Sequence, residues 1–174
     1  MAGDLEFEQL VNRYYEPLYQ FAFSLSRDEA DACDLTQQTF YVWARKGHQL
    51  RDTTKVKTWL FTTLHRQFLE ARRRETRFPS TNIEFAEGEL PTASISFNQV
   101  DTANVLQALG RVDEVFRAPV ALFYLQDCAY AEIAEILEVP LGTVKSRIAR
   151  GIAQLKQLLA DELPGGSSKQ GGTP

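Results

Sequence analysis

The sequence lacks the features of a secreted protein, a membrane protein or a metal-binding protein. It contains only two cysteines, Cys33 and Cys128, which form neither a disulfide framework nor a Cys-x-x-Cys pair for zinc. No run of about 18 apolar residues is present to cross a bilayer. The N-terminus, MAGDLEFEQL, has no basic start followed by an apolar stretch, as a signal peptide would. These absences predict a protein of the cytoplasm that does not insert into membranes.

Residue patterns typical of catalysis are absent as well. The sequence shows no Ser/His/Asp set, no acidic triad for a metal and no glycine-rich loop for phosphates. Tyrosines and serines occur near basic residues, but nothing in their spacing arranges them as nucleophiles. We therefore expect a binding protein that is not an enzyme and that needs no cofactor or metal.

What the sequence has is apolar residues at helical spacing along most of its length. Hydrophobic residues make up 44% of the 174 residues, which is enough to form buried cores. Apolar positions three and four residues apart are typical of one face of a helix. They predict helices over about residues 5–24, 28–46, 56–75, 98–109, 115–125, 131–138 and 141–159. The predicted fold class is all-α.

A break in composition divides the chain into two small helical domains. Residues 76–97 contain two prolines, one glycine and many small polar residues with no sustained period, which predicts a flexible acidic linker. This linker would join an N-terminal domain, residues 1–75, to a C-terminal domain, residues 98–160. The tail, residues 161–174, has no core-forming residues and is expected to be disordered.

The segment from Tyr130 to Leu159 predicts a helix-turn-helix. Its first helix ends at Val139-Pro140, because proline disfavours helical geometry in the preceding residue. Its second helix carries an apolar stripe and an opposite face with small polar and basic residues, as a helix in a DNA major groove would. The candidate DNA-contacting residues are Thr143, Lys145, Ser146, Arg147 and Arg150. An ordinary helical hairpin with a solvated charged face would show the same periodicity.

The net charge of −4 is distributed unevenly along the chain. Residues 51–77 hold 8 basic and 3 acidic side chains, and residues 140–174 hold 5 and 2. The segment between them, residues 78–139, holds 2 basic and 10 acidic side chains. Two basic segments separated by acidic chain predict a protein that contacts nucleic acid at two places and something else between them.

Three short motifs stand in register along the chain: residues 31–40 (DACDLTQQTF), 58–61 (TWLF) and 142–147 (GTVKSR). Together they resemble the extracytoplasmic-function (ECF) group of bacterial sigma-70 family factors. Residues 31–40 look like the family's acidic D-x-x-D-L-x-Q-x-T-F helix. Residues 58–61, TWLF, followed by an arginine cluster, are similar to its W-L-containing helix. Residues 142–147, GTVKSR, match the run that opens its recognition helix, and residues 132–134, EIA, match the supporting helix. The resemblance extends from Phe7 to Leu159.

The resemblance implies a factor that gives promoter specificity to RNA polymerase. The C-terminal domain would read the -35 element, and the N-terminal domain would recognise and melt the -10 element. The implied partners are promoter DNA, the clamp helices and flap of core RNA polymerase, and an anti-sigma factor. Asp34, Gln37 and Gln38 would contact the polymerase. The acidic linker would lie in the polymerase channel that otherwise carries RNA, or it would be a simple spacer.

The resemblance also assigns roles to individual DNA-contacting residues. Ser146 and Arg150 are candidates for base-edge contacts, each worth about 1–3 kcal/mol of discrimination. Lys145 and Arg147 would hold phosphates, although the stem of Arg147 alternatively packs on the domain. The basic residues expected to track the -10 DNA backbone are Lys55, Lys57, Arg66, Arg72, Arg73 and Arg74.

Two further expectations concern the melting of the -10 DNA. The polar loop over residues 49–57 would contact an unstacked base. Trp59 either stacks on DNA or packs in the core, and its position on the predicted helix favours the core.

Several positions depart from the family pattern. Cys33 and Gln38 stand where the family often has glutamate, and residues 65–66 read His-Arg where it usually has Arg-Asn. Ala149 is small where many members have a bulkier residue. The rival hypothesis is a helix-turn-helix regulator that binds DNA without polymerase, such as a response-regulator output domain. The N-terminal half argues against it, since it lacks the alternating strand-helix pattern of a receiver and has its own basic patch.

Overall fold

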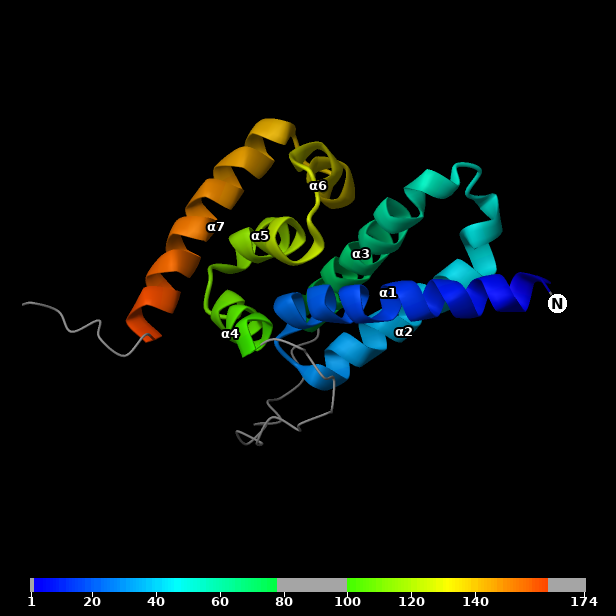
Figure 1. Cartoon of the computed structure of the whole chain (residues 1–174), viewed down its shortest axis with the longest axis horizontal. Coiled ribbons are helices and arrows are strands. Elements are labelled where there is room, and N and C mark those ends of the chain that lie inside the picture. The colour runs from blue at the N-terminus through cyan, green and yellow to red at the C-terminus, as the bar shows by residue number, and fades with distance from the viewer. Residues whose placement is uncertain (1, 78–99, 163–174) are drawn as a thin grey trace, which may run out of the picture.

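The computed structural model describes residues 2–77 and 100–162, and every regular element within them is helical (Figure 1). This confirms the all-α prediction. The helices are α1 (Ala2–Ser26), α2 (Glu29–Lys46), α3 (Val56–Arg77), α4 (Val100–Leu109), α5 (Glu114–Gln126), α6 (Tyr130–Leu137) and α7 (Leu141–Glu162). Two short 3-10 turns, η1 (Gly47–Gln49) and η2 (Thr53–Lys55), interrupt the loop predicted between α2 and α3.

The predicted linker and tail lie almost wholly outside the described residues. Helix α3 continues to Arg77, two residues into the predicted linker, and α7 continues to Glu162, two residues into the predicted tail. No helix within the described ranges combines the length and the apolar character that a bilayer crossing requires.

The two ends of α2 are formed by an aspartate N-cap and by a glycine that packs against a tryptophan ring. The side chain of Asp28, the N-cap residue, accepts a hydrogen bond from the backbone N–H of Asp31 at 2.9 Å. Gly47 is the C-cap, but its φ of −59° is ordinary helical geometry. Its small size matters instead, because a Cβ at this position would lie 2.5 Å from the ring of Trp43. That indole also meets Trp59 edge-on, with ring centroids 5.1 Å apart, so Trp59 packs within the protein as the sequence favoured.

The N-terminal helices, α1 to α3, pack around a core of large apolar side chains. Leu18, Phe21, Leu60 and Leu64 are fully buried, and the rings of Phe21 and Phe61 lie 5.4 Å apart. On α3 the buried face is formed by Leu60, Phe61, Leu64 and Phe68, while Ala71 is exposed.

The C-terminal helices, α4 to α7, assemble around α5. Its Val120 and Leu122 are completely buried, as are Ile133 of α6 and Val144 of α7. Helix α7 approaches α5 closely at Gly151, where a Cβ would clash with the side chain of Val120 and lie 3.0 Å from the Cβ of Phe116. The predicted apolar stripe of α7 is therefore the face that packs on the rest of the protein.

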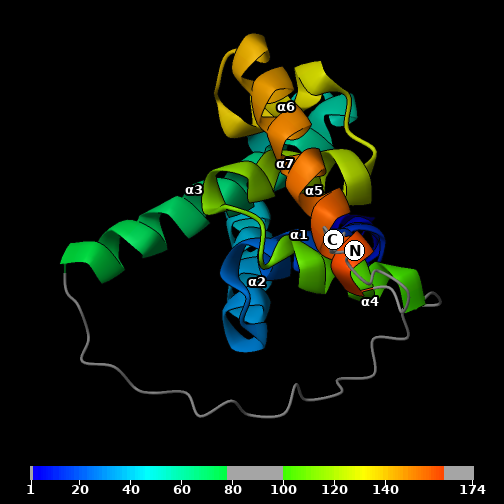
Figure 2. The ribbon, with the colours of Figure 1, turned by 90° about the vertical axis from the view of Figure 1, so that its left-hand side faces the viewer.

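The N-terminal and C-terminal helices pack directly on each other (Figures 1 and 2). Helix α1 contacts α4 and α5, while α3 contacts α6, so one continuous apolar cluster runs through both halves. Gln126 of α5 is 9% exposed and donates a hydrogen bond from Nε2 to the carbonyl oxygen of Pro17 in α1 at 3.1 Å. The sequence indicated two domains on a flexible linker, and the structure shows them in contact.

Candidate functional site

Helices α6 and α7 form the predicted helix-turn-helix. Between them, Glu138 adopts a left-handed conformation with φ 57° and ψ 44°, and its backbone N–H bonds to the carbonyl of Ala134. Pro140 follows and its carbonyl oxygen accepts from the N–H of Val144 at 3.2 Å, which starts the next helix. Helix α7 then lies at the outside of the molecule, in front of the other helices in Figure 2.

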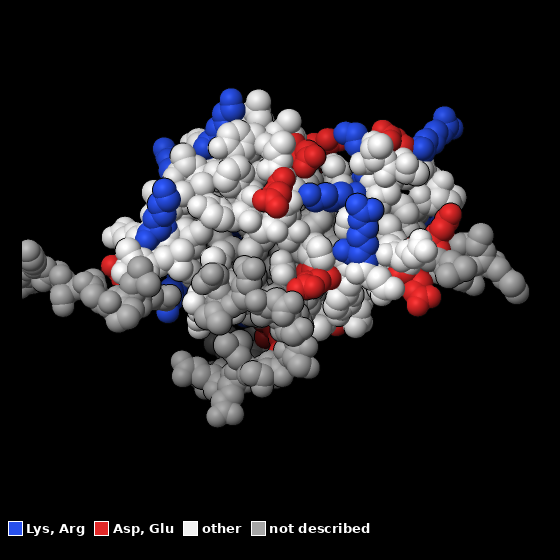
Figure 3. Space-filling view, viewed as in Figure 1, with Lys and Arg blue, Asp and Glu red and all other residues white. Residues whose placement is uncertain are grey.

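The outward face of α7 carries most of the predicted DNA-contacting residues. Lys145, Ser146, Ala149 and Arg150 are exposed, while Val144 and Ile148 on the opposite face are buried. Figure 3 shows basic side chains along the edge that α7 forms. Because α7 has no acidic residue before Asp161, its N-terminal half presents a surface of positive charge and small side chains that fits a DNA groove.

Two predicted members of this surface are less exposed. Thr143 and Arg147 are half-buried, since they flank the apolar stripe. A half-buried position is compatible with both sequence-based roles of Arg147, packing of its stem and contact of its charged head with a phosphate.

The basic residues predicted for the -10 element lie on α3 and the turn before it, and most of them contact the C-terminal helices. Lys55 pairs with Glu135 of α6, with Nζ and Oε2 3.2 Å apart, and Arg66 pairs with Glu138. Lys57 donates from Nζ to the carbonyl oxygen of Gln126 at 2.8 Å.

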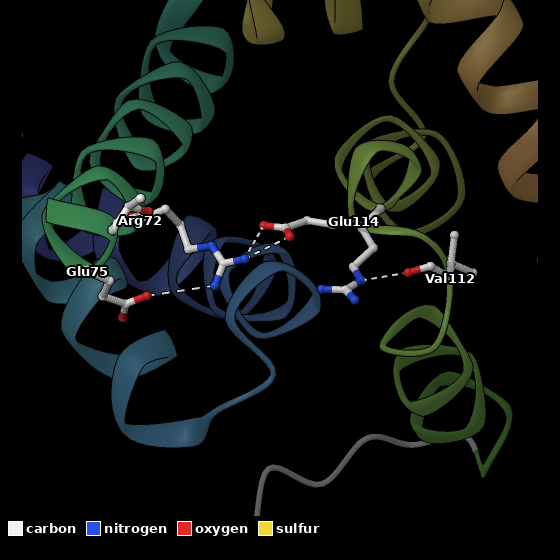
Figure 4. Close-up of polar contacts among 6 residues, drawn as sticks. Arg72, Glu75, Val112 and Glu114 are labelled. Carbon is white, nitrogen blue, oxygen red and sulfur yellow. Dashed lines mark hydrogen bonds and ion pairs between the residues drawn. The ribbon is translucent and has the colours of Figure 1, made fainter. Parts of the chain in front are cut away.

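Arg72 contacts α5 through Glu114. Its Nη2 lies 2.6 Å from Oε1 of Glu114, and its Nη1 lies 3.7 Å from Glu75 on its own helix (Figure 4). The remaining two predicted residues, Arg73 and Arg74, are exposed and form no ion pair with another described residue. Four of these six residues, which together make up the basic surface of α3 and the turn before it, are thus occupied by contacts within the chain itself.

The turn before α3 is organised by an aspartate that the sequence did not single out. Oδ1 of Asp52 accepts hydrogen bonds from the backbone N–H of Thr54 at 3.0 Å and from its hydroxyl at 2.6 Å. These hydrogen bonds stabilise the charged form and hold the pKa of the Asp52 carboxyl below its usual value. A preformed turn therefore presents Lys55 and Lys57 on the C-terminal side of this aspartate.

His65 lies half-buried on α3, where the resembled family usually has arginine. Its ring lies 6.4 Å from that of Phe21. Burial disfavours the imidazolium form and lowers the pKa of His65 to about 4, although the nearby Glu138 carboxylate acts in the opposite direction. At neutral pH this histidine is uncharged.

The depressed pKa of His65 predicts that stability falls as the pH falls. An unfolded histidine takes up a proton near its ordinary pKa of 6.5, whereas the folded one does so only near 4. The stabilisation is therefore present above about pH 6.5 and is lost as the pH drops towards about 4. From pH 8 to pH 5 we expect His65 to account for a loss of about 1–2 kcal/mol in the free energy of unfolding.

Urea unfolding of the wild type and of His65→Gln across this range measures the loss. The glutamine variant should show a flatter pH profile. Parallel profiles for the two proteins would contradict a depressed pKa in the folded state. The second histidine of the chain, His48, is exposed and remains in both proteins.

The predicted polymerase-contacting residues line an open groove between α2 and α3. Asp34, Gln37 and Gln38 are all exposed, and the groove has a volume of about 930 Å³. Its opposite wall includes Gln67 and Arg74 of α3. The groove is polar and shallow, and it suits a protein surface more than a small molecule.

Two groove residues were missed by the sequence-based prediction. Tyr41 lies one helical turn beyond Gln37 and is 55% exposed, with the guanidinium of Arg45 5.7 Å from its ring centroid. Asp31 lies one turn before Asp34, and burial together with neighbouring carboxylates raises its pKa. An exposed aromatic side chain at helical spacing from Gln37 was the available signal for Tyr41.

Neither the cysteines nor the acidic residues form a metal site within the described part of the chain. No group of three or more His, Cys, Asp or Glu side chains in residues 2–77 and 100–162 is arranged to hold a metal ion. Cys33 is half-buried and Cys128 is buried, and both are free thiols. Burial raises the pKa of the Cys128 thiol, which disfavours the reactive thiolate.

Comparison with known proteins identifies the class to which this geometry belongs. Residues 10–78 match the model of Sigma-70 region 2, and residues 102–155 match that of Sigma-70, region 4. ECF RNA polymerase sigma factor SigM of Mycobacterium tuberculosis is 34% identical over 161 residues, which cover 91% of this chain and 80% of the relative. SigE of Mycolicibacterium smegmatis is 33% identical over 158 residues, and the match spans 61% of its length. This chain belongs to the ECF sigma factors of the sigma-70 family.

Solved structures show the same arrangement of helices. The sigma factor RpoE of Bartonella quintana, crystallised with the anti-sigma factor NepR, aligns with a TM-score of 0.71 and 26% sequence identity. The alignment covers 91% of this chain and 99% of that one. CnrH, solved with the cytosolic domain of CnrY, aligns with a TM-score of 0.64 and 24% identity, which supports the fold alone.

Proposed function

We propose that this sigma factor binds core RNA polymerase and directs transcription from its own class of promoters. The observation that carries the proposal is the outer face of α7, where exposed Lys145, Ser146 and Arg150 surround the small Ala149. Such a face gives base-edge donors at its centre and cations for phosphates at its margins. In this proposal α7 reads the -35 element, and Thr143 and Arg147 support it from the flanks.

The N-terminal helices carry the second half of the proposed function. Residues 1–75 would form the domain that binds the -10 element, with Arg72, Arg73 and Arg74 along the DNA backbone. The groove between α2 and α3 would receive the clamp helices of the polymerase, and the C-terminal domain, residues 98–160, would contact the flap. Residues 76–97 would link the two domains.

A regulator that acts without polymerase explains less of the molecule. It would use α6 and α7 but would have no need for a segment that matches region 2 over residues 10–78. The proposed factor acts in the cytoplasm and supplies no catalytic group, since the chemistry of RNA synthesis belongs to the polymerase. The sigma factor RpoE of Bartonella quintana was solved with the anti-sigma factor NepR, which supports control of this factor by an anti-sigma protein.

The groove provides the test of polymerase binding. Lysines at Asp34 and Gln38, one helical turn apart on α2, would place two cations where the proposed contact is acidic and polar. We expect Asp34→Lys/Gln38→Lys to weaken binding to core polymerase at least tenfold, because like charges and lost hydrogen bonds at a protein interface are costly. Comigration with core polymerase on a sizing column and promoter-directed transcription in vitro measure the effect.

A matched control is Asn12→Lys/Glu16→Lys, which introduces the same charge at the same spacing on the exposed face of α1. This control should bind core polymerase as the wild type does. If the wild-type chain does not comigrate with core polymerase, the proposed function is wrong. If both double variants bind equally well, the groove is not the contact.

A further inference from the structure

We propose that the C-terminal helices act as an intramolecular competitor of -10 DNA, because their acidic side chains occupy the basic face of α3 in a closed state. This inference rests on the proposed role of that basic face in DNA binding. Helix α6 packs on α3, and Glu114, Glu135 and Glu138 each pair with one of its basic residues or with the turn before it. Promoter DNA needs the same cations.

The pairs join parts of the chain that lie far apart in sequence. Lys55 and Glu135 are separated by 80 positions, Arg66 and Glu138 by 72, and Arg72 and Glu114 by 42. They bring the basic segment, residues 51–77, against the acidic segment, residues 78–139. Figure 3 shows acidic and basic side chains side by side where α6 meets α3. Three basic residues of the first segment are therefore paired with three acidic residues of the second within the same chain.

The geometry of the pairs resembles the binding of phosphate. Nη2 of Arg72 lies 2.6 Å and 2.7 Å from the two carboxylate oxygens of Glu114, and Glu75 approaches the other terminal nitrogen (Figure 4). Arginine uses these same donors for phosphate oxygens. The ammonium of Lys57 is likewise occupied, since it donates to the carbonyl oxygen of Gln126. A DNA strand has to replace these acceptors before it uses the donors.

The closed state is held by two kinds of contact, which respond differently to a competitor. The buried apolar cluster runs through both halves, and Gln126 ties α5 to α1 through Pro17. The paired side chains are about half exposed, at 49–62%, so each pair contributes little net stability. The apolar contact thus supplies most of the free energy that holds the halves together, while the ion pairs together add a smaller part and decide which anion the basic face holds. Within the proposed set, Arg73 and Arg74 take part neither in these described ion pairs nor in a hydrogen bond like that of Lys57, which leaves a place for DNA to start binding.

One of the pairs also reaches the helix-turn-helix. Glu138 is the residue with positive φ that ends α6, and Arg66 holds its carboxylate. The same contact lowers the pKa of the Glu138 carboxyl through the hydrogen bond from Arg66. The turn before α7 is therefore bound to the basic face of α3, and the -35 and -10 surfaces separate only when this contact opens.

The test removes the acidic partners and leaves the proposed DNA-binding residues intact. The variant is Glu114→Gln/Glu135→Gln/Glu138→Gln in the full-length chain. The probe is a fluorescent single-stranded DNA of mixed sequence, about 20 nucleotides long, followed by anisotropy at low salt. We expect about tenfold tighter binding than for the wild type, because a larger share of molecules presents a free basic face. Small-angle scattering should show a larger radius of gyration.

A matched control separates this effect from general electrostatics. Glu8→Gln/Glu16→Gln/Asp161→Asn changes the net charge equally, at exposed positions outside the pairs. It should show the wild-type radius of gyration and at most a small gain in affinity. Equal DNA affinity for the two triple variants, whatever their shapes, would overturn the proposal. If the first triple variant has a lower melting temperature than the control, the DNA-binding test is repeated with single variants. Glu114→Gln and Glu135→Gln are then each compared with Asp161→Asn.

The proposed function and this inference fail in different ways. Promoter-directed transcription with core polymerase is measured separately, and it is expected to persist in both triple variants. If the two triple variants bind the single-stranded DNA equally well and both still direct transcription, the intramolecular competitor is rejected and the sigma-factor assignment stands. Adding Arg66→Gln to the Glu114→Gln/Glu135→Gln/Glu138→Gln variant should weaken DNA binding again, because it removes one of the cations that DNA and the carboxylates compete for.

Discussion

Replacing Ser146 and Arg150 with alanine is expected to reduce promoter-directed transcription about 100-fold while binding to core polymerase stays unchanged. Both side chains are exposed on the outer face of α7, one helical turn apart, and neither supports the core. Two base-edge contacts of about 1–3 kcal/mol each, with a factor of ten for every 1.4 kcal/mol, give a loss of this size. Run-off transcription with core polymerase measures it, and comigration on a sizing column checks polymerase binding.

The control for this prediction lies on the same helix. Lys156 and Gln157 are exposed beyond the N-terminal half of α7, and their replacement by alanine removes a cation and a polar group away from the proposed groove contact. Transcription by this control should stay within about twofold of the wild type, as a distant surface change allows. Equal losses in the two variants would mean that α7 acts through its overall charge and does not read bases at Ser146 and Arg150.

The helix-turn-helix was predictable because its determinants are local. Pro140 ends α6 and favours the start of α7, and the spacing from Val144 to Ile148 fixes which face of α7 is buried. Once that face is known, the exposure of Ser146 and Arg150 follows from helical geometry alone. Asp34 and Gln38 were predicted from the resemblance to the family's acidic helix, and the structure places both at the groove.

The contacts of the basic face were not predictable in the same way. The sequence shows that residues 51–77 are basic and that residues 78–139 are acidic, but it does not show that α6 lies on α3. Pairing of Arg66 with Glu138 depends on the relative position of two helices that no local rule determines. The burial of His65 is a further example, since its environment comes from α1 and α6 as well as from its own helix.

The surface proposed to bind the -35 element and the surface proposed to bind the -10 element differ in how accessible they are. The outer face of α7 is accessible in the structure, whereas three of the six basic residues proposed for the -10 element pair with the chain's own carboxylates and a fourth, Lys57, donates to a backbone carbonyl. A factor built in this way would meet DNA first through α7, and its -10 surface would become available when the halves separate. Polymerase, which is proposed to bind the α2–α3 groove, would contact α3, the helix on which α6 packs.

Replacing Gly151 with valine is expected to destabilise the protein by about 3 kcal/mol. A Cβ at Gly151 would clash with the side chain of Val120, and two further methyl groups would extend the clash towards Phe116. Val120 is completely buried and β-branched, so its side chain is held close to one preferred rotamer and has little freedom to make room. Helix α7 would have to move away from α5, and overpacking of this kind costs about 1–3 kcal/mol and sometimes more.

The same substitution at Gly142 provides the control, because a Cβ there meets nothing within 4 Å. Gly142→Val should change the free energy of unfolding by less than about 0.5 kcal/mol, as other exposed substitutions do. Thermal unfolding followed by circular dichroism distinguishes the two, with a melting temperature about 6–12 °C lower for Gly151→Val, given 2–4 °C per kcal/mol in a chain of this size. Equal melting temperatures would show that α5 and α7 are not closely packed at Gly151. Because Gly151 lies directly after Arg150, this variant should also impair promoter binding, but together with a loss of stability that Ser146→Ala/Arg150→Ala does not share.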